Sequence, residues 1–250
     1  MKKILVTGAN GQLGSEIKML APNYPNFEFI FTDIEDFPLD QSDVIVANFN
    51  IIKPDIVINC AAYTAVDKAE QDQVVADAIN HLAIATLANL CSDSGAKLVH
   101  ISTDYVFDGL SPIAYKEEDQ PNPKSVYGST KLAGEMACLK NCPTSIIIRT
   151  AWVYSEFGNN FVKTMLRLGS ERGQLNVVYD QIGTPTYAIP TWLAKKYPSV
   201  LVTTPQGQRK YGARQNMDIT DIHYRFHAER VIRKIMEHVK NHPAIIGYQV

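Results

Sequence analysis

The chain has 250 residues and a mass of 27.9 kDa, with 46% hydrophobic and 20% charged residues. This composition can bury a core, which excludes a disordered chain, and the length suits one large α/β domain. The 24 basic and 26 acidic residues give a formal net charge of -2, so the charge gives no reason to expect a nucleic-acid partner.

The sequence shows no sign of a membrane or secretion segment. No apolar run approaches the roughly 20 residues that span a bilayer. The run after Lys2 and Lys3 ends at Thr7-Gly8, which is too short for a signal peptide. Cys60, Cys91, Cys138 and Cys142 lack metal-ligand spacing and are expected to be reduced thiols. We therefore expect a cytoplasmic protein without a membrane partner.

Strands and helices alternate along the first 180 residues. Short apolar runs predict strands at Lys3–Thr7, Phe27–Thr32, Asp55–Ala61, Lys97–Ser102, Ser145–Thr150 and Leu175–Tyr179. Helices are predicted at Gly11–Leu20, Lys68–Ser92, Val126–Leu139 and Asn160–Arg172. This alternation implies right-handed βαβ crossovers, so the expected fold class is α/β with a doubly wound, Rossmann-like parallel sheet.

A glycine-rich turn links the first strand to the first helix. Gly8, Gly11 and Gly14 follow a G-x-x-G-x-x-G spacing. The first glycine permits a tight turn, the second a close approach of a pyrophosphate, and the third close packing of helix on strand. Unpaired N–H groups at the helix start favour phosphate. The pattern therefore predicts a dinucleotide site.

Asp33 ends the second predicted strand, where a carboxylate can accept hydrogen bonds from an adenosine ribose. Its charge would repel a 2′-phosphate, which favours NAD or dual use over strict NADP. A carboxylate that merely caps a turn is the alternative.

Tyr127 and Lys131 are four residues apart, so they share one face of a predicted helix. A lysine ammonium beside a phenol lowers the tyrosine pKa, and the phenol can then protonate a carbonyl oxygen as hydride arrives. Thr103 follows the fourth strand and is expected to lie beside Tyr127. These residues predict a ketone reductase.

Five segments carry a resemblance to a known family: Val6–Gly14, Asn59–Glu70, Ser102–Gly109, Arg149–Tyr154 and Asp180–Tyr187. Over about residues 1–188 the chain resembles the dTDP-4-dehydrorhamnose reductases, a family of extended short-chain dehydrogenase/reductases. The resemblance implies reduction of the C4 ketone of dTDP-4-dehydro-L-rhamnose by NADPH or NADH, with a nucleotide-sugar partner. It also brings Mg²⁺ and a homodimer into consideration.

The resemblance assigns roles to individual residues. It implies that Thr103, Tyr127 and Lys131 are catalytic. Substrate-binding positions are Thr64, Val66, Thr103, Asp104 and Trp152. Cofactor-binding positions are Gly8, Asn10, Gly11, Gln12, Leu13, Gly14, Asp33, Leu39, Asp40, Ala61, Ala62, Tyr63, Asn80, Tyr127 and Lys131. Asn80 falls where relatives position the lysine through water. The alternatives are a core aromatic for Trp152 and a helix-surface amide for Asn80.

Three other functions are known for proteins with a similar pattern. Sugar-nucleotide 4,6-dehydratases place an Asp-Glu pair after the threonine, whereas Tyr105 follows Asp104 here, which disfavours dehydration. A sugar-nucleotide 4-epimerase remains open. So does a non-catalytic, regulatory reductase-like protein, as known for a relative of methionine adenosyltransferase, although the intact Thr103, Tyr127 and Lys131 disfavour it.

Residues 189–250 depart from the reductase pattern. Residues 1–189 carry 14 basic and 22 acidic residues, but 190–250 carry 10 and 4. Ile189–Pro198, Gly212–Asn216 and His242–Val250 resemble part of the (β/α)₈ barrel of family 42 β-galactosidases, without its acid/base residues. We assign no hydrolase activity to this tail and expect no independent domain in it.

The tail contains a predicted amphipathic helix. Its apolar face comprises Tyr224, Ala228, Val231, Ile232, Ile235 and Val239. Two pairs of histidines spaced four apart are interpreted as solvated, not as metal ligands. Our hypothesis is that two unrelated coding segments join near Gly183–Ala188. With the usual substrate domain replaced, we expect dinucleotide binding but weak or no reductase activity.

Overall fold

The computed structural model describes residues 1–111, 114–172, 174, 176–177, 186–187, 203–204 and 207–208. The chain divides into two compact units, Met1–Gly158 and Asn159–Val250. The predicted boundary at residue 188 stays a prediction.

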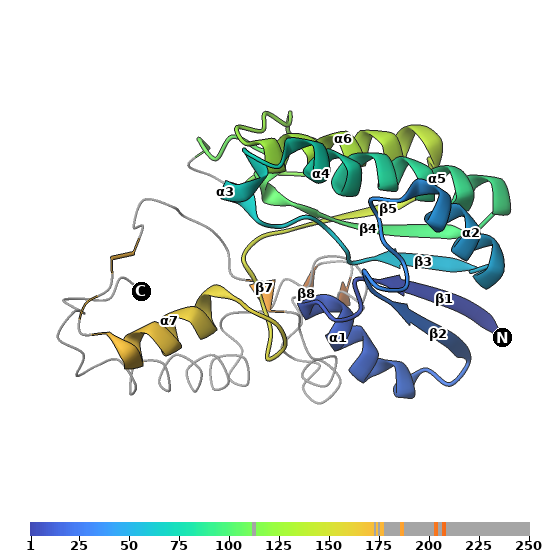
Figure 1. The fold of residues 1–250 in the computed structure, drawn as a ribbon, viewed down its shortest axis with the longest axis horizontal. Coiled ribbons are helices and arrows are strands. Elements are labelled where there is room, and N and C mark those ends of the chain that lie inside the picture. Colours follow the sequence, from blue (N-terminus) through green and yellow to red (C-terminus); the bar gives the residue numbers. More distant parts are fainter. Residues whose placement is uncertain are drawn as a thin grey trace. The chain divides into compact units, whose positions relative to one another are not determined.

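A five-stranded parallel sheet forms the centre of the first unit, with the order β2-β1-β3-β4-β5 (Figure 1). Its strands are β1 (Lys2–Thr7), β2 (Phe27–Thr32), β3 (Ile56–Asn59), β4 (Lys97–Thr103) and β5 (Ile146–Thr150). Leu5 and Val6 point to opposite faces and are both fully buried, as a strand covered on both sides requires. The predicted doubly wound α/β fold is confirmed.

Helices cover both faces of this sheet. α1 (Gln12–Leu20) lies on one face, and α2 (Ser42–Ile52), α5 (Ala83–Ser94) and α6 (Val126–Asn141) lie on the other (Figure 1). Short 3₁₀ turns follow α1 and β4: η1 (Ala21–Asn23) and η3 (Asp104–Val106). Between the three helices and the sheet, one core cluster includes Phe49, Leu87 and Leu98. Burial of each such side chain contributes about 1.5–3 kcal/mol.

Helix α2 was not predicted from the sequence. Its residues, SDVIVANFNII, are apolar on several sides, so no clear stripe with a period of 3.6 marks it. In the fold, Ile45 and Phe49 share the buried side at a spacing of four residues. The helix ends at Ile52, and its C-cap residue Lys53 has a left-handed φ of 51°.

The predicted helix Lys68–Ser92 is a broken series. α3 (Val66–Ala69) is followed by α4 (Gln73–Asp77), a π turn η2 (Ala78–Leu82) and α5. Asp72 lies at the break, where it accepts a hydrogen bond from the Tyr63 hydroxyl (2.9 Å) and pairs with Lys68 (3.0 Å). By length and composition alone, Gln73–Ser94 is apolar enough to cross a membrane. Its buried Ile84 and Leu87 belong to the core, which gives the apolar character a structural reason.

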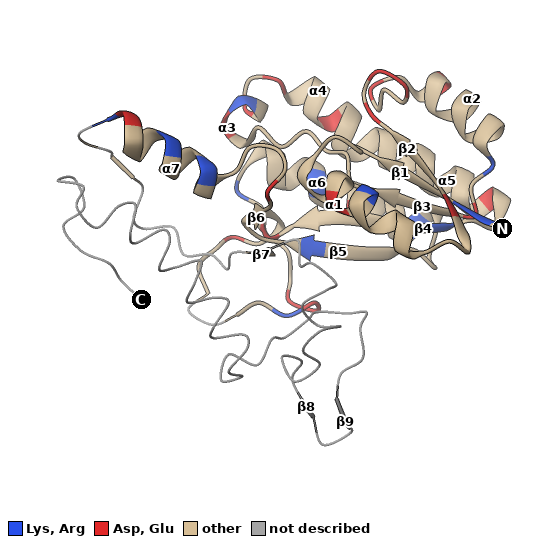
Figure 2. Ribbon diagram, turned by 90° about the horizontal axis from the view of Figure 1, so that it is seen from below, with Lys and Arg blue, Asp and Glu red and all other residues tan. Residues whose placement is uncertain are grey.

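Charged residues are interspersed over the helices and loops (Figure 2). The four cysteines are free, as expected. Burial raises the pKa of Cys60 and of Cys91 to about 12, so these two thiols are unreactive at neutral pH.

The rest of the chain is described in part. β6 (Val153–Tyr154) closes the first unit, and the second begins with α7 (Phe161–Glu171), capped by the Asn160 side chain on the Lys163 N–H (3.0 Å). β7 (Thr186–Tyr187), β8 (Thr203–Thr204) and β9 (Gly207–Gln208) follow, and β8 pairs antiparallel with β9. In the predicted strand Leu175–Tyr179, residues 175, 178 and 179 lie outside the described residues, as does the predicted amphipathic helix.

Candidate active site

The glycine turn lies at the carboxyl end of β1. Gly8 has a φ of +66°, and a Cβ there would lie 2.7 Å from the backbone nitrogen of Ala61. A Cβ on Gly14 would overlap the carbonyl oxygen of Gly8. Both positions therefore require glycine, the first for its conformation and the second for the packing of α1 on the turn.

The start of α1 fits the diphosphate of a dinucleotide. The helix begins at Gln12, and its N-cap residue Gly11 provides no side chain to pair with the first N–H groups. Asn10 and Gly11 are exposed, and a Cβ on Gly11 would meet only the Gly8 carbonyl oxygen, at 3.2 Å. The helix dipole and the N–H groups there favour an anion. Leu13 and Gln12 are half-buried, and the Gln12 side chain donates to the Val153 carbonyl (3.3 Å).

Asp33 fastens this turn to β2. Its carboxylate accepts hydrogen bonds from the backbone N–H groups of Asn10 (2.7 Å) and Ile34 (2.8 Å). Asp33 therefore caps the turn, as the alternative interpretation has it. Each of its carboxylate oxygens can still accept a hydrogen bond from a ribose hydroxyl. Leu39 is buried in the core, whereas Asp40 is exposed.

The segment after β3 forms the next part of the site. Ala61, Ala62 and Tyr63 are half-buried there. The Asn80 amide accepts from the Tyr63 N–H (2.9 Å) and donates to the Tyr63 carbonyl (3.1 Å) and to the Thr130 hydroxyl (3.2 Å). Asn80 is 1% exposed, so the interpretation as a helix-surface amide is wrong. Its side chain joins this segment to α6.

Helix α6 carries Tyr127 and Lys131 one turn apart on a buried face. Ser125 caps it by accepting from the Gly128 N–H (3.1 Å), and Glu70 accepts from the Val126 N–H (2.8 Å). A Cβ on Gly128 would overlap the Tyr105 carbonyl oxygen. The glycine after the tyrosine therefore lets α6 start against the turn that follows β4.

Thr103 and Tyr127 meet at the end of β4. The Thr103 hydroxyl accepts from the Tyr105 N–H (3.2 Å) and donates to the Asp104 carboxylate (3.1 Å). Thr103 also acts on the Tyr127 phenol, whose pKa it lowers. Tyr105 packs edge-on against the Tyr127 ring, with centroids 5.5 Å apart.

The prediction that Lys131 lowers the Tyr127 pKa is wrong in this structure. Burial raises the pKa of Tyr127, and Asp104 and Tyr105 raise it further, so the phenol holds its proton at neutral pH. Lys131 instead lies against β4, where its amine donates to the Ile101 carbonyl (2.7 Å) and contacts His100 Nε2 (3.4 Å). Burial lowers the pKa of Lys131 to about 8.

Apart from Thr103, which ends β4, the substrate-binding positions lie on segments that follow β3, β4 and β5. Thr64 is exposed, and Val66 packs against a small cluster that includes Tyr127. Asp104 is half-buried, and its burial raises its pKa. Trp152 is 39% exposed, so the interpretation as a core aromatic is wrong. Its φ of 46° is left-handed, a conformation that bulky residues rarely adopt.

Several residues around the site were not predicted from the sequence. A Cβ on Gly134 would overlap the Asn80 carbonyl oxygen, so α6 packs directly on the π turn η2. Glu135 and Arg149 form a pair with contacts of 2.6 and 2.9 Å, and the Arg149 guanidinium lies 4.9 Å from the Phe107 ring centroid. Asn59 and His100 connect the strands beneath Lys131.

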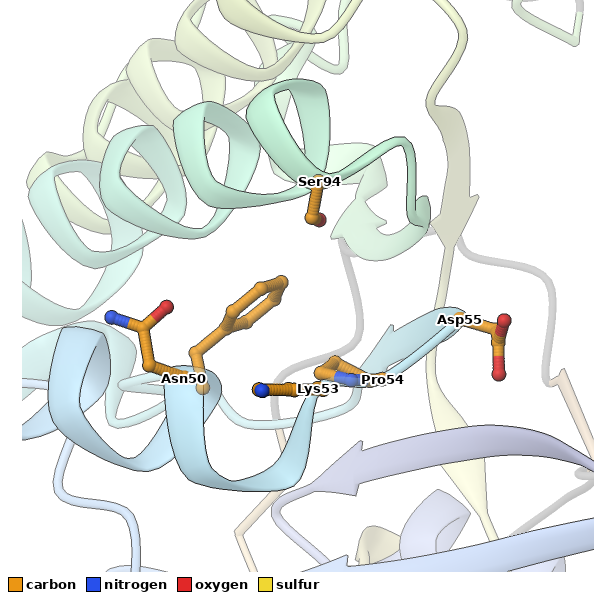
Figure 3. Close-up of a pocket in the computed structure, with 6 residues that line it drawn as sticks. Asn50, Lys53, Pro54, Asp55 and Ser94 are labelled. Carbon is orange, nitrogen blue, oxygen red and sulfur yellow. The ribbon is translucent and has the colours of Figure 1, made fainter.

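A shallow pocket of about 410 Å³ lies elsewhere (Figure 3). Lys53, Asp55 and Ser94 line it, and they precede β3 and β4. It therefore lies at the amino ends of the strands, whereas ligands of open α/β sheets bind at the carboxyl ends. Among the described residues, no group of three or more His, Cys, Asp or Glu side chains is arranged to hold a metal ion.

Comparison with known proteins gives a consistent result. The sequence model of a family described as the RmlD substrate binding domain matches residues 1–212. A dTDP-4-dehydrorhamnose reductase from Aggregatibacter actinomycetemcomitans is 43% identical over 188 residues, which are 75% of this chain and 64% of the relative. One from Sinorhizobium fredii is 44% identical over 74% of this chain and 62% of its own length. This chain thus spans slightly less than two thirds of these curated relatives.

Solved structures agree. A dTDP-4-dehydrorhamnose reductase from Clostridium acetobutylicum has 49% identity and a TM-score of 0.71, covering 74% of this chain and 66% of that one. One from Bacillus anthracis, in complex with NADP, has 43% identity and a TM-score of 0.71, covering 75% of this chain and 67% of its own.

Proposed function

The chain belongs to the family of the RmlD substrate binding domain, and from that premise we propose that it is an oxidoreductase of dTDP-rhamnose biosynthesis. It binds NADPH or NADH at the glycine turn and reduces the C4 ketone of dTDP-4-dehydro-L-rhamnose to the alcohol of dTDP-L-rhamnose. The relatives named for this activity support the proposal. So does the NADP bound to the relative from Bacillus anthracis.

One observation carries the proposal. Thr103 ends β4, and Tyr105, two residues later, packs edge-on against the Tyr127 ring, which places Thr103 and Tyr127 at the carboxyl end of β4, in the same parallel sheet whose β1 ends in the glycine turn. Carboxyl ends of parallel strands meet at one edge. The proton donor and the dinucleotide turn therefore belong to the same edge of the molecule.

The roles of the residues follow from their chemistry. When bound, the reduced nicotinamide supplies the hydride to the C4 carbon. Tyr127 donates the proton to the carbonyl oxygen, and its raised pKa keeps that proton in place beforehand. Thr103 orients the oxygen, and Lys131 binds the ribose and provides positive charge as the phenol loses its proton.

A comparison of three proteins tests the proposal. NADPH and NADH binding is titrated by fluorescence, and turnover is followed as NADPH consumption with dTDP-4-dehydro-L-rhamnose. We expect Gly11→Ala to weaken dinucleotide binding at least tenfold, because its methyl group occupies the surface where the diphosphate would lie. We expect Tyr127→Phe to bind the dinucleotide normally and to lose turnover.

The outcome also separates the alternatives. Dinucleotide binding without any turnover supports the non-catalytic regulatory protein, and interconversion of sugar epimers without net NADPH consumption supports a 4-epimerase. The Asp33 carboxylate predicts that NADH serves at least as well as NADPH, since the negative charge repels a 2′-phosphate. A strong NADPH preference would contradict that part alone.

Three further expectations belong to the same proposal. A sugar nucleotide is the partner, the cytoplasm is the compartment, and a homodimer is the assembly to test by light scattering. Magnesium is a candidate ligand by resemblance alone, and the turnover assay with and without Mg²⁺ decides it.

A further inference from the structure

A chain of buried polar side chains runs beneath the site, across three strands. Thr7 on β1 donates to Asn59 Oδ1 on β3 (2.5 Å), and Asn59 Nδ2 lies 3.0 Å from His100 Nδ1 on β4. His100 Nε2 in turn lies 3.4 Å from the amine of Lys131 on α6. Each of these four residues is at most 1% exposed, so no bulk water competes for the contacts.

The orientation of the Asn59 amide is determined by a backbone group. Asn59 Nδ2 lies 3.3 Å from the carbonyl oxygen of Ala61, which can only accept a hydrogen bond. The nitrogen of the amide must therefore face Ala61 and His100, and the oxygen must face Thr7. A flipped amide would place two acceptors against each other.

This orientation selects one tautomer of His100. Because Asn59 donates to Nδ1, that nitrogen carries no proton, and a neutral imidazole then has its proton on Nε2. Burial and the charge of Lys131 keep the pKa of His100 well below its ordinary value, so the ring is neutral at pH 7. The Nε2–H group consequently points at Lys131.

An ammonium group has three donors and no acceptor, so it cannot accept from Nε2–H. Only the neutral amine has a lone pair for that contact. The protonated Lys131 thus finds its strand-side anchor at the Ile101 carbonyl (2.7 Å) and not at His100. Among the described residues, Glu135 on α6 also acts on the Lys131 pKa and raises this pKa.

We propose that His100 is a positioning residue of the site. Asn59 holds His100 as the Nε2–H tautomer, and this N–H group faces Lys131 from the strand side. The contact disfavours the charged form of Lys131 and directs the other ammonium protons toward the open site. The kinetic consequence of this inference rests on the proposed function, in which Lys131 assists Tyr127. Its structural part stands without a substrate or cofactor.

The first test needs no ligand, and a variant is used only to assign signals. Long-range ¹⁵N–¹H correlation spectra of the full chain labelled at its six histidines report which ring nitrogen of each carries the proton. The His100 signals are assigned by their absence in His100→Gln. We expect a neutral ring protonated at Nε2 throughout pH 6–9, a range that brackets the usual histidine pKa of about 6.5. A ring protonated at Nδ1, or a charged ring at pH 7, overturns the proposal.

The second test follows the Lys131 amine itself, by NMR titration of its Cε and Nζ nuclei. In a glutamine the amide nitrogen can replace Nε2–H, whereas an asparagine is too short to reach Lys131 but can still accept from Asn59. We therefore expect His100→Asn to raise the Lys131 pKa by roughly one unit, and His100→Gln to leave it within about 0.3 unit.

Two controls complete the design. Glu135→Gln removes the group that raises the Lys131 pKa, so the titration should move downward and thereby show that the measurement responds. His81→Asn changes a half-buried histidine that pairs with Asp77 and should move nothing. Equal Lys131 titrations in wild type and His100→Asn would overturn the proposal.

The kinetic arm separates this inference from the function. If the ammonium form assists Tyr127, reduction slows as Lys131 loses its proton near pH 8, and His100→Asn moves that limb upward with the Lys131 pKa. Absence of any reductase activity refutes the proposed function and leaves the tautomer result to decide the inference.

Discussion

The packing of α6 on the π turn η2 makes Gly134 a sensitive position. A Cβ there would overlap the backbone carbonyl oxygen of Asn80, and a backbone atom cannot rotate away as a side chain can. We estimate that Gly134→Ala forces α6 outward by about 1 Å. Overpacking of this kind costs about 1–3 kcal/mol, against a gain of about 0.4–1 kcal/mol from the stiffer unfolded chain.

The expected net loss is about 1–2 kcal/mol, which corresponds to a fall in Tm of about 2–8 °C for a chain of this size. Because α6 carries Tyr127 and Lys131, the same displacement should reduce turnover by roughly 100-fold. Thermal unfolding and NADPH consumption measure the two effects. Gly169→Ala in α7 is the matched control, since its Cβ would meet nothing within 4 Å and it should be neutral or stabilising. A Gly134→Ala variant as stable as Gly169→Ala would refute the reasoning.

Two other changes test the electrostatics. The Lys131 pKa falls from 10.5 to about 8 on folding, so the buried ammonium costs stability in full below pH 8, and the cost disappears as pH rises to 10.5. Lys131→Met should therefore stabilise the chain by up to about 3 kcal/mol at pH 7 and by much less at pH 10. Its activity should be lost. A gain in stability that does not depend on pH would argue against a buried ammonium. Glu135→Gln leaves the Arg149 guanidinium, which is 22% exposed, without its carboxylate and should cost about 1–3 kcal/mol in denaturant unfolding. Glu171→Gln, in an exposed pair with Arg167, should change stability by less than about 0.5 kcal/mol, and equal effects would contradict the assignment of the buried pair.

Local patterns predicted what depends on neighbours in the sequence. The glycine turn, the helical spacing of Tyr127 and Lys131, and the position of Thr103 at the end of β4 all follow from such patterns, and so does the parallel sheet. Helix α2 was missed because its apolar residues surround the helix, and the burial of two of them is visible only in the fold.

The electrostatic part was not predictable because it depends on strand order. Thr7, Asn59 and His100 lie opposite one another on β1, β3 and β4, and no sequence spacing shows that register. The Lys131 amine contacts His100 in this row and donates to the Ile101 carbonyl. Lys131 therefore does not lower the Tyr127 pKa as expected. Burial, which the spacing of residues in the sequence cannot show either, raises the Tyr127 pKa instead of lowering it.

The most direct measurement is NADPH consumption by the full chain with dTDP-4-dehydro-L-rhamnose, wild type against Tyr127→Phe, each with its NADPH affinity measured alongside. We predict equal affinities, weak but measurable turnover by the wild type, and a rate for the variant lower by at least 100-fold, because general acid catalysis contributes roughly 10²–10⁴-fold. Equal rates in the two proteins would contradict the assignment of the proton to Tyr127. Failure of both to bind a dinucleotide would contradict the role of the glycine turn.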